Sequence, residues 1–419
     1  MTAKNFINFH VLISHSPSCL NRDDQNMQKT AIFGGVNRVR VSSQSLKRTM
    51  RTSTYYTKAL GTSSTRTRNL ENLIPIFTEQ LQNEFEPALI AKTMELFVRA
   101  KSSDEEVKEY DETNEAAESD AAPKKLAVAP WSVEEIRVLC SIVREVTLTE
   151  EEVTKAKAAV AKQKGRKKKT EQELLDEALT KKRVKAVKDK IELVRTAIGK
   201  SVDIALSGRM ATSGLMTSVD GAMAIAHAIT THAVEPQDVD WFTAVDDLTS
   251  DAGETGAGHL DTQQFSSGVF YRYASLNLRQ LQVNLGLIEN MKSAETAESR
   301  AQALAIARHV LHLLATVVPS AKQQSFAAHN LADFAVASFA DQPISLANAF
   351  EEPIKRDRNG GFLKPSITAL AEYWARIHAA YGLDETARAF AVQGDVALNG
   401  KPVATLAELE SWVVSDGQA

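Results

Sequence analysis

Cysteine is scarce in this chain of 419 residues, which contains only Cys19 and Cys140. Two cysteines cannot build a disulfide framework, so we expect a protein of the reducing cytoplasm. Long apolar runs are missing too, and none approaches the length of a membrane span. The stretch from Phe6 to Ile13 is interrupted by polar residues and has no charged segment before it, unlike a signal peptide. These absences predict a soluble cytoplasmic protein without a membrane partner.

A large net charge is also missing, because 49 lysines and arginines nearly balance 53 aspartates and glutamates. The charges are nevertheless segregated along the chain. Residues 25–70 contain nine basic residues and no acid, residues 104–120 contain nine acids and one lysine, and residues 155–169 contain eight basic residues and no acid. Dense basic blocks are typical of surfaces that bind phosphate. The block at 155–169 fits a flexible surface linker equally well, and both interpretations stay open.

Enzyme signatures are missing as well. There is no GxxxxGK[ST] phosphate loop and no GxSxG nucleophile turn. No zinc pattern surrounds the four paired histidines, so we expect no metal and no cofactor; they are His227 with His232 and His309 with His312. Asp23 and Asp24 leave two interpretations open, because adjacent carboxylates can hold a metal in nucleases but more often cap turns in loops.

The hydrophobic periodicity predicts a mixture of strands and helices. Residues 6–13 alternate apolar side chains with Asn8 and His10, which predicts a strand that is buried on one face only. Ser42 or Ser43 is expected to cap a helix that continues to about Tyr56. Further helices are expected at 131–147, at 304–318, and within 150–200 with an interruption near residue 165; further strands are expected at 38–41, 243–248 and 268–274. This order predicts an α+β fold with insertions, including a glycine-rich loop at 253–258.

The strongest local signal lies in the helix that begins at Ser43. Four polar or basic residues recur at positions i, i+3, i+4 and i+7 and therefore share one helix face; they are Gln44, Lys47, Arg48 and Arg51. Arginine forks and a lysine point charge on one face suit a row of phosphates. No acid lies nearby in the sequence, which favours phosphate binding over an ordinary solvated face.

A second signal is the adjacent pair Trp241 and Phe242. Neighbouring residues of a strand point to opposite faces, so both rings cannot enter one core. One interpretation is that a ring stacks on or wedges between unstacked bases. The other is that one ring anchors the strand while the second ring lies at a protein interface, and the sequence leaves both open.

Several segments resemble the CasC-type backbone subunit (Cas-seven family) of the type I-E CRISPR Cascade complex. They include HVLISHSPSCLNRDD at 10–24, AIFGG at 31–35, RVSSQSLKR at 40–48, VDIALSGRMATSG at 202–214, DWFTAVDDL at 240–248 and FSSGVFYRYA at 265–274. Shorter matches lie at 5–8, 220–223 and 226–232. They follow the family order over most of the chain. Residues 104–175 depart from the family in length and charge, so nothing is carried over there.

The resemblance implies a hand-shaped α+β fold: a ferredoxin-like (RRM-related) palm, an inserted helical fingers domain and a thumb β-hairpin. The implied boundaries are 1–60 for the first part of the palm, 61–200 for the fingers with a variable segment at 104–175, 201–234 for the return to the palm, 235–265 for the thumb, and 266–419 for the second part of the palm. Base stacking on an open sheet face is not expected, because the first strand lacks the aromatic motif of RRM domains.

The resemblance also implies partners and site residues. Copies would stack into a helical filament along the guide RNA (crRNA), together with other Cascade subunits, and would support pairing with target DNA and R-loop formation in antiviral defence. A recruited nuclease-helicase would act downstream, and this subunit would not be an enzyme. Guide-binding positions are Arg22, Gln44, Lys47, Arg48 and Arg51. Positions that wedge the guide–target hybrid are Met210, Trp241, Phe242, Thr243 and Val245. A target-DNA patch comprises Lys181, Lys182, Lys185 and Lys188.

Two other functions stay open from the sequence. A guide-dependent ribonuclease, as in type III backbone subunits, would use Asp23 or Asp24. A standalone single-strand binding protein would need no partner subunits. A scaffold that must accept any guide sequence should hold phosphates and leave the base edges free, which agrees with the basic helix face.

Overall fold

The computed structural model describes residues 4–99, 125–161, 170–210, 218–244, 257–393, 398 and 402–418. The chain forms two compact units. Unit 1 comprises Met1–Gly61, Ala222–Gln282 and Asn290–Ala419, and unit 2 comprises Thr62–Gly221 and Val283–Glu289. The division into palm, fingers and thumb at the residues given above stays a prediction.

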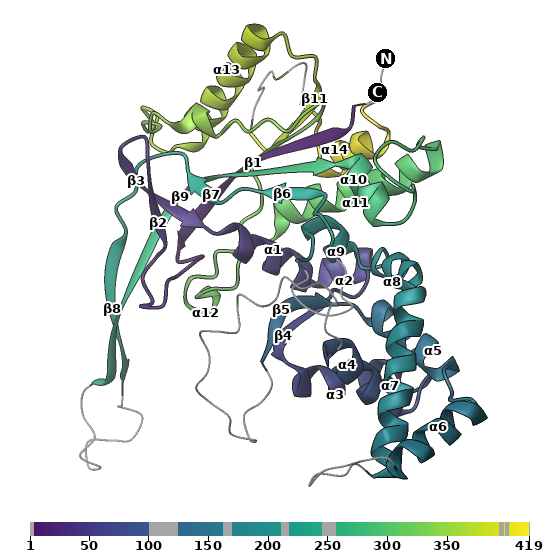
Figure 1. Ribbon diagram of the computed structural model, residues 1–419. Helices are drawn as coiled ribbons and strands as arrows, with labels where there is room; N and C mark the ends of the chain where they lie inside the picture. The colour runs from purple at the N-terminus through teal and green to yellow at the C-terminus, as the bar shows by residue number, and fades with distance from the viewer. Residues whose placement is uncertain are drawn as a thin grey trace. The chain divides into compact units, whose positions relative to one another are not determined.

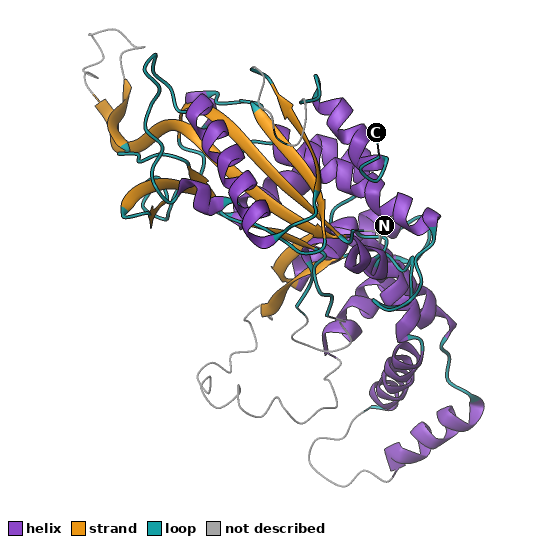
Figure 2. Ribbon diagram, turned by 90° about the horizontal axis from the view of Figure 1, so that it is seen from above, coloured by secondary structure: helices purple, strands orange, loops and turns teal. Residues whose placement is uncertain are grey.

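Unit 1 is built on one large antiparallel sheet (Figures 1 and 2) with the strand order β11-β10-β1-β9-β7-β3-β2, and β6 and β8 also pair with β9. The strands are β1 Phe6–Ser18, β2 Thr30–Phe33, β3 Val36–Val41, β6 Met223–Ile225, β7 Ala228–Thr230, β8 Gln237–Ala244, β9 Ala257–Asn277, β10 Phe334–Ala340 and β11 Thr386–Ala391. The helices are α1 Ser43–Thr52, α2 Thr54–Leu60, α11 Ala297–Thr316, α12 Gln323–Phe326, the 3-10 helix η3 Ala347–Phe350, α13 Leu363–Tyr381 and α14 Leu406–Val414. The expected mixture of helices and strands is confirmed.

Strand β1 corrects the expectation of a strand buried on one face. Asn8 and His10 are as fully buried as the apolar residues between them. Helix α13 covers the face that carries His10, whose ring lies edge-on to Trp374 at 6.0 Å between ring centres. Helix α11 contacts the same strand, and Figure 1 shows α13 and α11 on opposite sides of the sheet. The polar side chains are tolerated because they are hydrogen-bonded: His10 Nδ1 lies 2.8 Å from the Tyr271 hydroxyl.

A long hairpin extends the sheet (Figure 1). Strand β8 pairs with the first part of the 21-residue strand β9, with Trp241 opposite Asp261 and Phe242 opposite Leu260. The strand expected at 268–274 is confirmed within β9. The strand expected at 243–248 begins earlier, at Gln237, and its residues from 245 onward lie outside the described part of the chain, as does the loop at 253–256.

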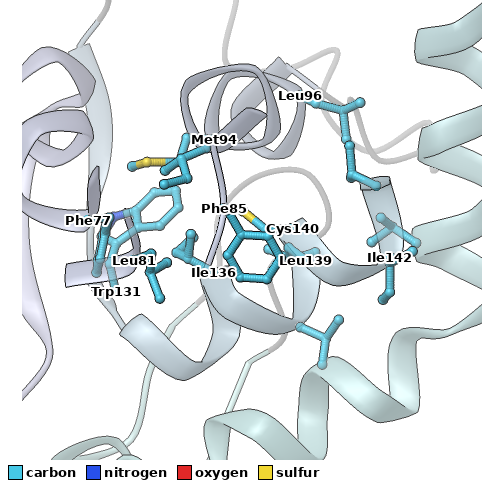
Figure 3. Close-up of a cluster of buried hydrophobic side chains, with 14 of the residues drawn as sticks. Phe77, Leu81, Phe85, Met94, Leu96, Trp131, Ile136, Leu139, Cys140 and Ile142 are labelled. Carbon is cyan, nitrogen blue, oxygen red and sulfur yellow. The ribbon is translucent and has the colours of Figure 1, made fainter. Parts of the chain in front are cut away.

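Unit 2 is mostly helical. Its elements are β4 Thr65–Asn69, α3 Leu70–Leu81, α4 Pro87–Arg99, β5 Lys125–Trp131, α5 Val133–Glu145, α6 Glu150–Ala161, α7 Glu171–Asp189, α8 Ile191–Ile198 and α9 Val202–Ser207; helix α10, Leu278–Asn284, spans both units. The core gathers side chains such as Phe77, Leu81, Ile136 and Leu139 (Figure 3). Trp131, expected at the start of a helix, instead ends β5 and pairs with Thr65. Helix α5 therefore begins two residues later, after Ser132.

Both cysteines are free and buried. Burial raises the pKa of the Cys140 thiol to about 11, so it acts as a small apolar side chain of the unit 2 core (Figure 3). Among the helices of the described residues, none is both long enough and apolar enough to cross a membrane.

Candidate nucleic-acid interface

Helix α1 presents the basic face that the sequence predicts. Ser42 caps the helix by accepting a hydrogen bond from the Ser45 backbone N–H at 3.2 Å. Leu46 and Met50 are buried and fix the helix against the core of unit 1. The helix ends earlier than expected, because Ser53 is extended and its hydroxyl caps α2 through the Tyr56 N–H at 3.1 Å. This break leaves α1 as a separate ten-residue helix.

The predicted guide-binding residues of α1 differ in exposure. Gln44 and Arg48 are exposed, whereas Lys47 and Arg51 are half-buried. The fifth predicted residue, Arg22, is exposed in the loop after β1 and bonds the Asn26 side chain.

Asn21 fixes this loop against α1. Its side-chain oxygen accepts the Ser42 backbone N–H at 2.9 Å, directly at the helix cap. The position of Arg22 relative to Arg48 is therefore set by a specific hydrogen bond between their elements.

The loop also shows what Asp23 does. Its Oδ1 atom accepts the backbone N–H groups of Gln25 and Met27, both at 2.9 Å. This is the turn-capping interpretation of the Asp23–Asp24 pair. Asp24 is exposed.

A groove of about 750 Å³ brings Arg22 and Arg48 together. It is lined by α1 and the start of α2, by residues 20–22, and by residues 317–322 after α11. Arg22, Arg48 and Lys322 supply three cationic side chains, and none of the described residues that line the groove is a carboxylate. The Ser45 hydroxyl adds a neutral polar group, whereas the hydroxyls of Thr49 and Thr52 donate to the Ser45 and Arg48 carbonyls of α1 and present acceptor oxygens. The groove thus offers an electropositive, hydroxyl-rich channel.

Lys322 is a site residue that the sequence analysis missed. It lies 274 residues after Arg48 and has a left-handed backbone, with φ at 53°. No periodic pattern surrounds it, because the segment between α11 and β10 contains only the one-turn helix α12. Only the fold brings it to the groove. Gln44, Lys47 and Arg51 do not line the groove, so Arg48 is the one residue of the predicted α1 face that does; the other lining residues of α1 are Ser45, Thr49 and Thr52.

Arg38 corrects the idea that the whole basic block at 25–70 faces phosphate. Its guanidinium is fully buried and donates only to backbone carbonyls, among them Thr230 O at 3.1 Å and Phe350 O at 2.8 Å. Burial lowers the pKa of Arg38. This arginine holds the β2–β3 hairpin against the turn after η3, so one of the nine basic residues is structural.

The structure describes the backbone of four of the five predicted wedge residues. Met210 is 83% exposed in unit 2, directly after Arg209. Trp241, Phe242 and Thr243 occupy successive positions of β8 in unit 1. Val245 lies outside the described residues. A common wedge made of these residues stays a prediction.

The predicted target-DNA patch on α7 is reduced by an ion pair. Lys181, Lys185 and Lys188 are exposed, but the Lys182 ammonium lies 2.6 Å from Glu152 Oε2 on α6. The hydrogen bond from Lys182 lowers the pKa of Glu152 to about 2, so the pair is ionised at neutral pH. Among the described residues, Lys182 is therefore the member of this patch that forms an ion pair, and the other three lysines are exposed.

The paired histidines have other partners. His309 Nδ1 lies 2.8 Å from the Tyr55 hydroxyl, and His312 stacks on the Tyr55 ring while its Nδ1 lies 2.8 Å from Glu410. His227 accepts the Ser43 backbone N–H at 2.9 Å, and His232 stacks on Phe362. Within the described ranges, no group of three or more metal-binding side chains comes together.

Two solved structures are similar to this chain. A chain of a "CRISPR RNA-guided surveillance complex, pre-nicking" is 27% identical with a TM-score of 0.70, and the match covers 98% of this chain and 100% of that one. A chain of a "CRISPR RNA-guided surveillance complex" is 21% identical with a TM-score of 0.55 over 99% and 100% of the two chains, which shows a shared fold. No curated protein matches the sequence.

This protein therefore has an α+β fold that is similar to the fold of chains in RNA-guided surveillance complexes. Residues 7–414 match the family of CT1975-like proteins, and the chain belongs to this family.

Proposed function

We propose that this chain is a backbone subunit of an RNA-guided CRISPR surveillance complex and holds the phosphate backbone of the guide RNA in the groove beside α1. The observation that supports this most is the convergence of Arg22, Arg48 and Lys322 around a groove without a lining carboxylate. The similarity to a chain of such a complex over nearly the whole length supports the assembly.

The chemistry of the groove fits a scaffold that accepts any guide. Guanidinium and ammonium groups bind phosphates without reading bases, and hydroxyls can add hydrogen bonds to phosphate or ribose. The base edges stay free to pair with a target strand. Binding should therefore be insensitive to sequence and strongly sensitive to salt.

The finer assignments belong to the same proposal. The subunit is of the CasC type in a type I-E Cascade, unit 1 contains a ferredoxin-like palm, unit 2 corresponds to the fingers, and the β8–β9 hairpin is the thumb. Copies form a helical filament along the crRNA with other Cascade subunits in the cytoplasm, and the thumb kinks the guide at regular intervals. The exposed lysines of α7 capture target DNA, and a separate nuclease-helicase is recruited.

The proposed subunit is not a nuclease and carries no cofactor. Asp23 is engaged in capping its own turn through two backbone N–H groups, which favours a structural role. The test is incubation of assembled complexes with complementary RNA or DNA and magnesium or manganese. We expect no cleavage. Regularly spaced cuts that vanish in Asp23→Asn or Asp24→Asn would contradict the scaffold function and support the guide-dependent ribonuclease function.

The guide-binding test is the double variant Arg22→Ala/Arg48→Ala. The slope of log affinity against log salt for a single-stranded RNA should decrease in magnitude by about 1.4, or 0.7 for each lost phosphate contact. Lys58→Ala is the matched control, because Lys58 is an exposed basic residue on α2 that does not line the groove. An unchanged slope in a folded double variant would show that the groove does not bind phosphate. Filaments that form on RNA without other subunits would favour the standalone binding protein.

A further inference from the structure

The wall of the groove formed by residues 317–322 has little regular structure of its own. It begins where α11 ends at Thr316, and the chain returns to the sheet only at β10. Two residues of this connection, Lys322 and Ala327, have left-handed backbones. A strained, irregular segment keeps one position only when neighbouring groups hold it. The placement of the Lys322 side chain in the groove therefore depends on contacts from outside the segment.

Arg272 supplies such contacts at the start of the wall. It lies on β9, is only 2% exposed, and donates from Nη1 to Leu314 O at 2.9 Å and to Val317 O at 2.8 Å. The carbonyls at the end of a helix lack partners within the helix and carry partial negative charge. One guanidinium thus caps α11 and fixes the first residue of the wall, Val317, which itself lines the groove.

The same guanidinium reaches the far end of the segment through His15. Arg272 Nη2 lies 3.3 Å from His15 Nε2, and His15 Nδ1 lies 3.3 Å from Asn330 Oδ1. Burial, with the nearby Arg272 charge, lowers the pKa of His15 to about 3. A neutral imidazole can accept from Arg272 with one nitrogen and donate to Asn330 with the other. The series of contacts from Arg272 through His15 to Asn330 therefore reaches both ends of residues 317–330, the segment that contains Lys322.

Arg272 is also a charge without a counter-ion. No carboxylate lies within ion-pair distance of it in the described part of the chain. Burial lowers its pKa only to about 10, so it stays charged at neutral pH. Burying an unpaired charge costs free energy that packing with an apolar side chain would avoid. A positive charge directly behind the wall adds to the attraction of the groove for phosphate.

We propose that Arg272 is a positioning residue for the groove: it acts through the segment 317–330 to hold Lys322 against the RNA backbone, and its charge reinforces the potential behind the wall formed by residues 317–322. The inference rests on the proposed function, because it assigns Arg272 to the same RNA-binding groove. The occupant is the phosphodiester backbone of a single-stranded RNA.

The experiment is a double-mutant cycle on the full chain with a single-stranded RNA of mixed sequence as the probe. Arg272→Met should weaken RNA binding by about tenfold when Lys322 is present and by no more than about twofold in a Lys322→Ala background, since residues of one network are not additive. Arg272→Lys should recover only part of the affinity, because a lysine keeps the charge but cannot bond two carbonyls and His15 at once.

Arg38→Met is the matched control. Arg38 is an equally buried guanidinium that bonds backbone carbonyls in the same sheet, but it holds the β2–β3 hairpin and does not line the groove. At a temperature where the variants are folded by circular dichroism, Arg38→Met should leave RNA affinity unchanged. If Arg272→Met does not fold, Asn330→Ala removes the contact with His15, together with the hydrogen bonds that Asn330 Oδ1 accepts from the Ser16 backbone N–H and hydroxyl, and should weaken binding in the same Lys322-dependent way.

Equal losses from Arg272→Met with and without Lys322, or equal losses from Arg38→Met, would overturn the inference and make Arg272 a purely structural residue. This result is distinct from failure of the proposed function. If Arg22→Ala/Arg48→Ala leaves the salt slope unchanged, the groove itself is not the RNA site. If that double variant behaves as expected while the cycle is additive, only the role of Arg272 is wrong.

Discussion

The buried ion pair between Glu135 and Arg209 allows a quantitative test of what holds unit 2 together. Both side chains have no exposed surface. Arg209 donates from Nη1 to Glu135 Oε2 at 2.7 Å and from Nη2 to Oε1 at 3.0 Å, a two-pronged arrangement that matches the two planar groups. The pair links α5 to the strand-like bridge that precedes the exposed Met210.

Arg209→Met should destabilise the protein strongly because it leaves the Glu135 carboxylate buried without its counter-charge. Breaking one side of a buried pair costs roughly 3–5 kcal/mol, a large share of the 5–15 kcal/mol by which domains are typically stable. Replacing both residues, in Arg209→Met/Glu135→Leu, removes the unpaired charge. The double variant should therefore regain most of the loss, and similar replacements elsewhere are neutral or stabilising.

The assay is urea unfolding followed by circular dichroism and by tryptophan fluorescence, since Trp131 is buried in the core of unit 2. We expect the single variant to unfold at clearly lower urea and the double variant near the wild type. If the double variant is as unstable as the single one, the pair contributes through specific packing rather than charge compensation, and the reasoning is wrong. Lys182→Ala, which removes the partly exposed ion pair with Glu152, should shift the urea midpoint far less than Arg209→Met in the same assay.

Three further predictions concern the lysines of α7, the two aromatic residues of β8 and the buried His10. Lys185→Ala should slow association with duplex DNA at low salt while Lys182→Ala changes it little, because only Lys182 is neutralised by an acid; equal rate effects in stopped-flow measurements would contradict this. Trp241→Ala/Phe242→Ala should leave the chain folded and weaken guide–target hybridisation by about 1–3 kcal/mol per lost stacking contact, whereas an insoluble product would identify the rings as core anchors. Burial lowers the pKa of His10 from 6.5 to about 3, so the unfolded chain binds more protons between these values and stability falls as the pH falls; this residue should cost about 2 kcal/mol between pH 7 and pH 5, and unfolding of His10→Gln at both pH values should lack that part of the loss.

The sequence by itself determined the features that depend on near neighbours. The basic face of α1 follows from a spacing of three and four residues, and a serine cap at Ser42 or Ser43 follows from residues within one turn; the structure selects Ser42. Strand β1 and helix α11 were predictable from apolar periodicity, and so was the strand at residues 268–274, which lies within β9. Periodicity and β-rich composition suffice to predict that these elements exist, because both are properties of neighbouring residues, but they do not predict how many faces of a strand are covered.

The extent of burial was not predictable, because it depends on what packs from elsewhere. His10 looks like a solvent-facing residue until α13, more than 350 residues later, covers it, and Asn8 does so until Tyr273 and the backbone at Gln342 and Ile344 reach it. Arg38 looks like a phosphate ligand until the Phe350 carbonyl reaches it. Lys182 looks like its neighbours on α7 until α6 places Glu152 beside it.

Only the tertiary structure decided the composition of the groove. Arg22, Arg48 and Lys322 come from three segments, and the third has no pattern that distinguishes it from any other polar connection. Its position is set by hydrogen bonds from β9 and β1 to the ends of the segment. A charge acts over the few ångströms that the fold establishes, whatever the separation along the chain, so the sequence could predict the basic helix α1 but not the segment 317–322 that lines the same groove.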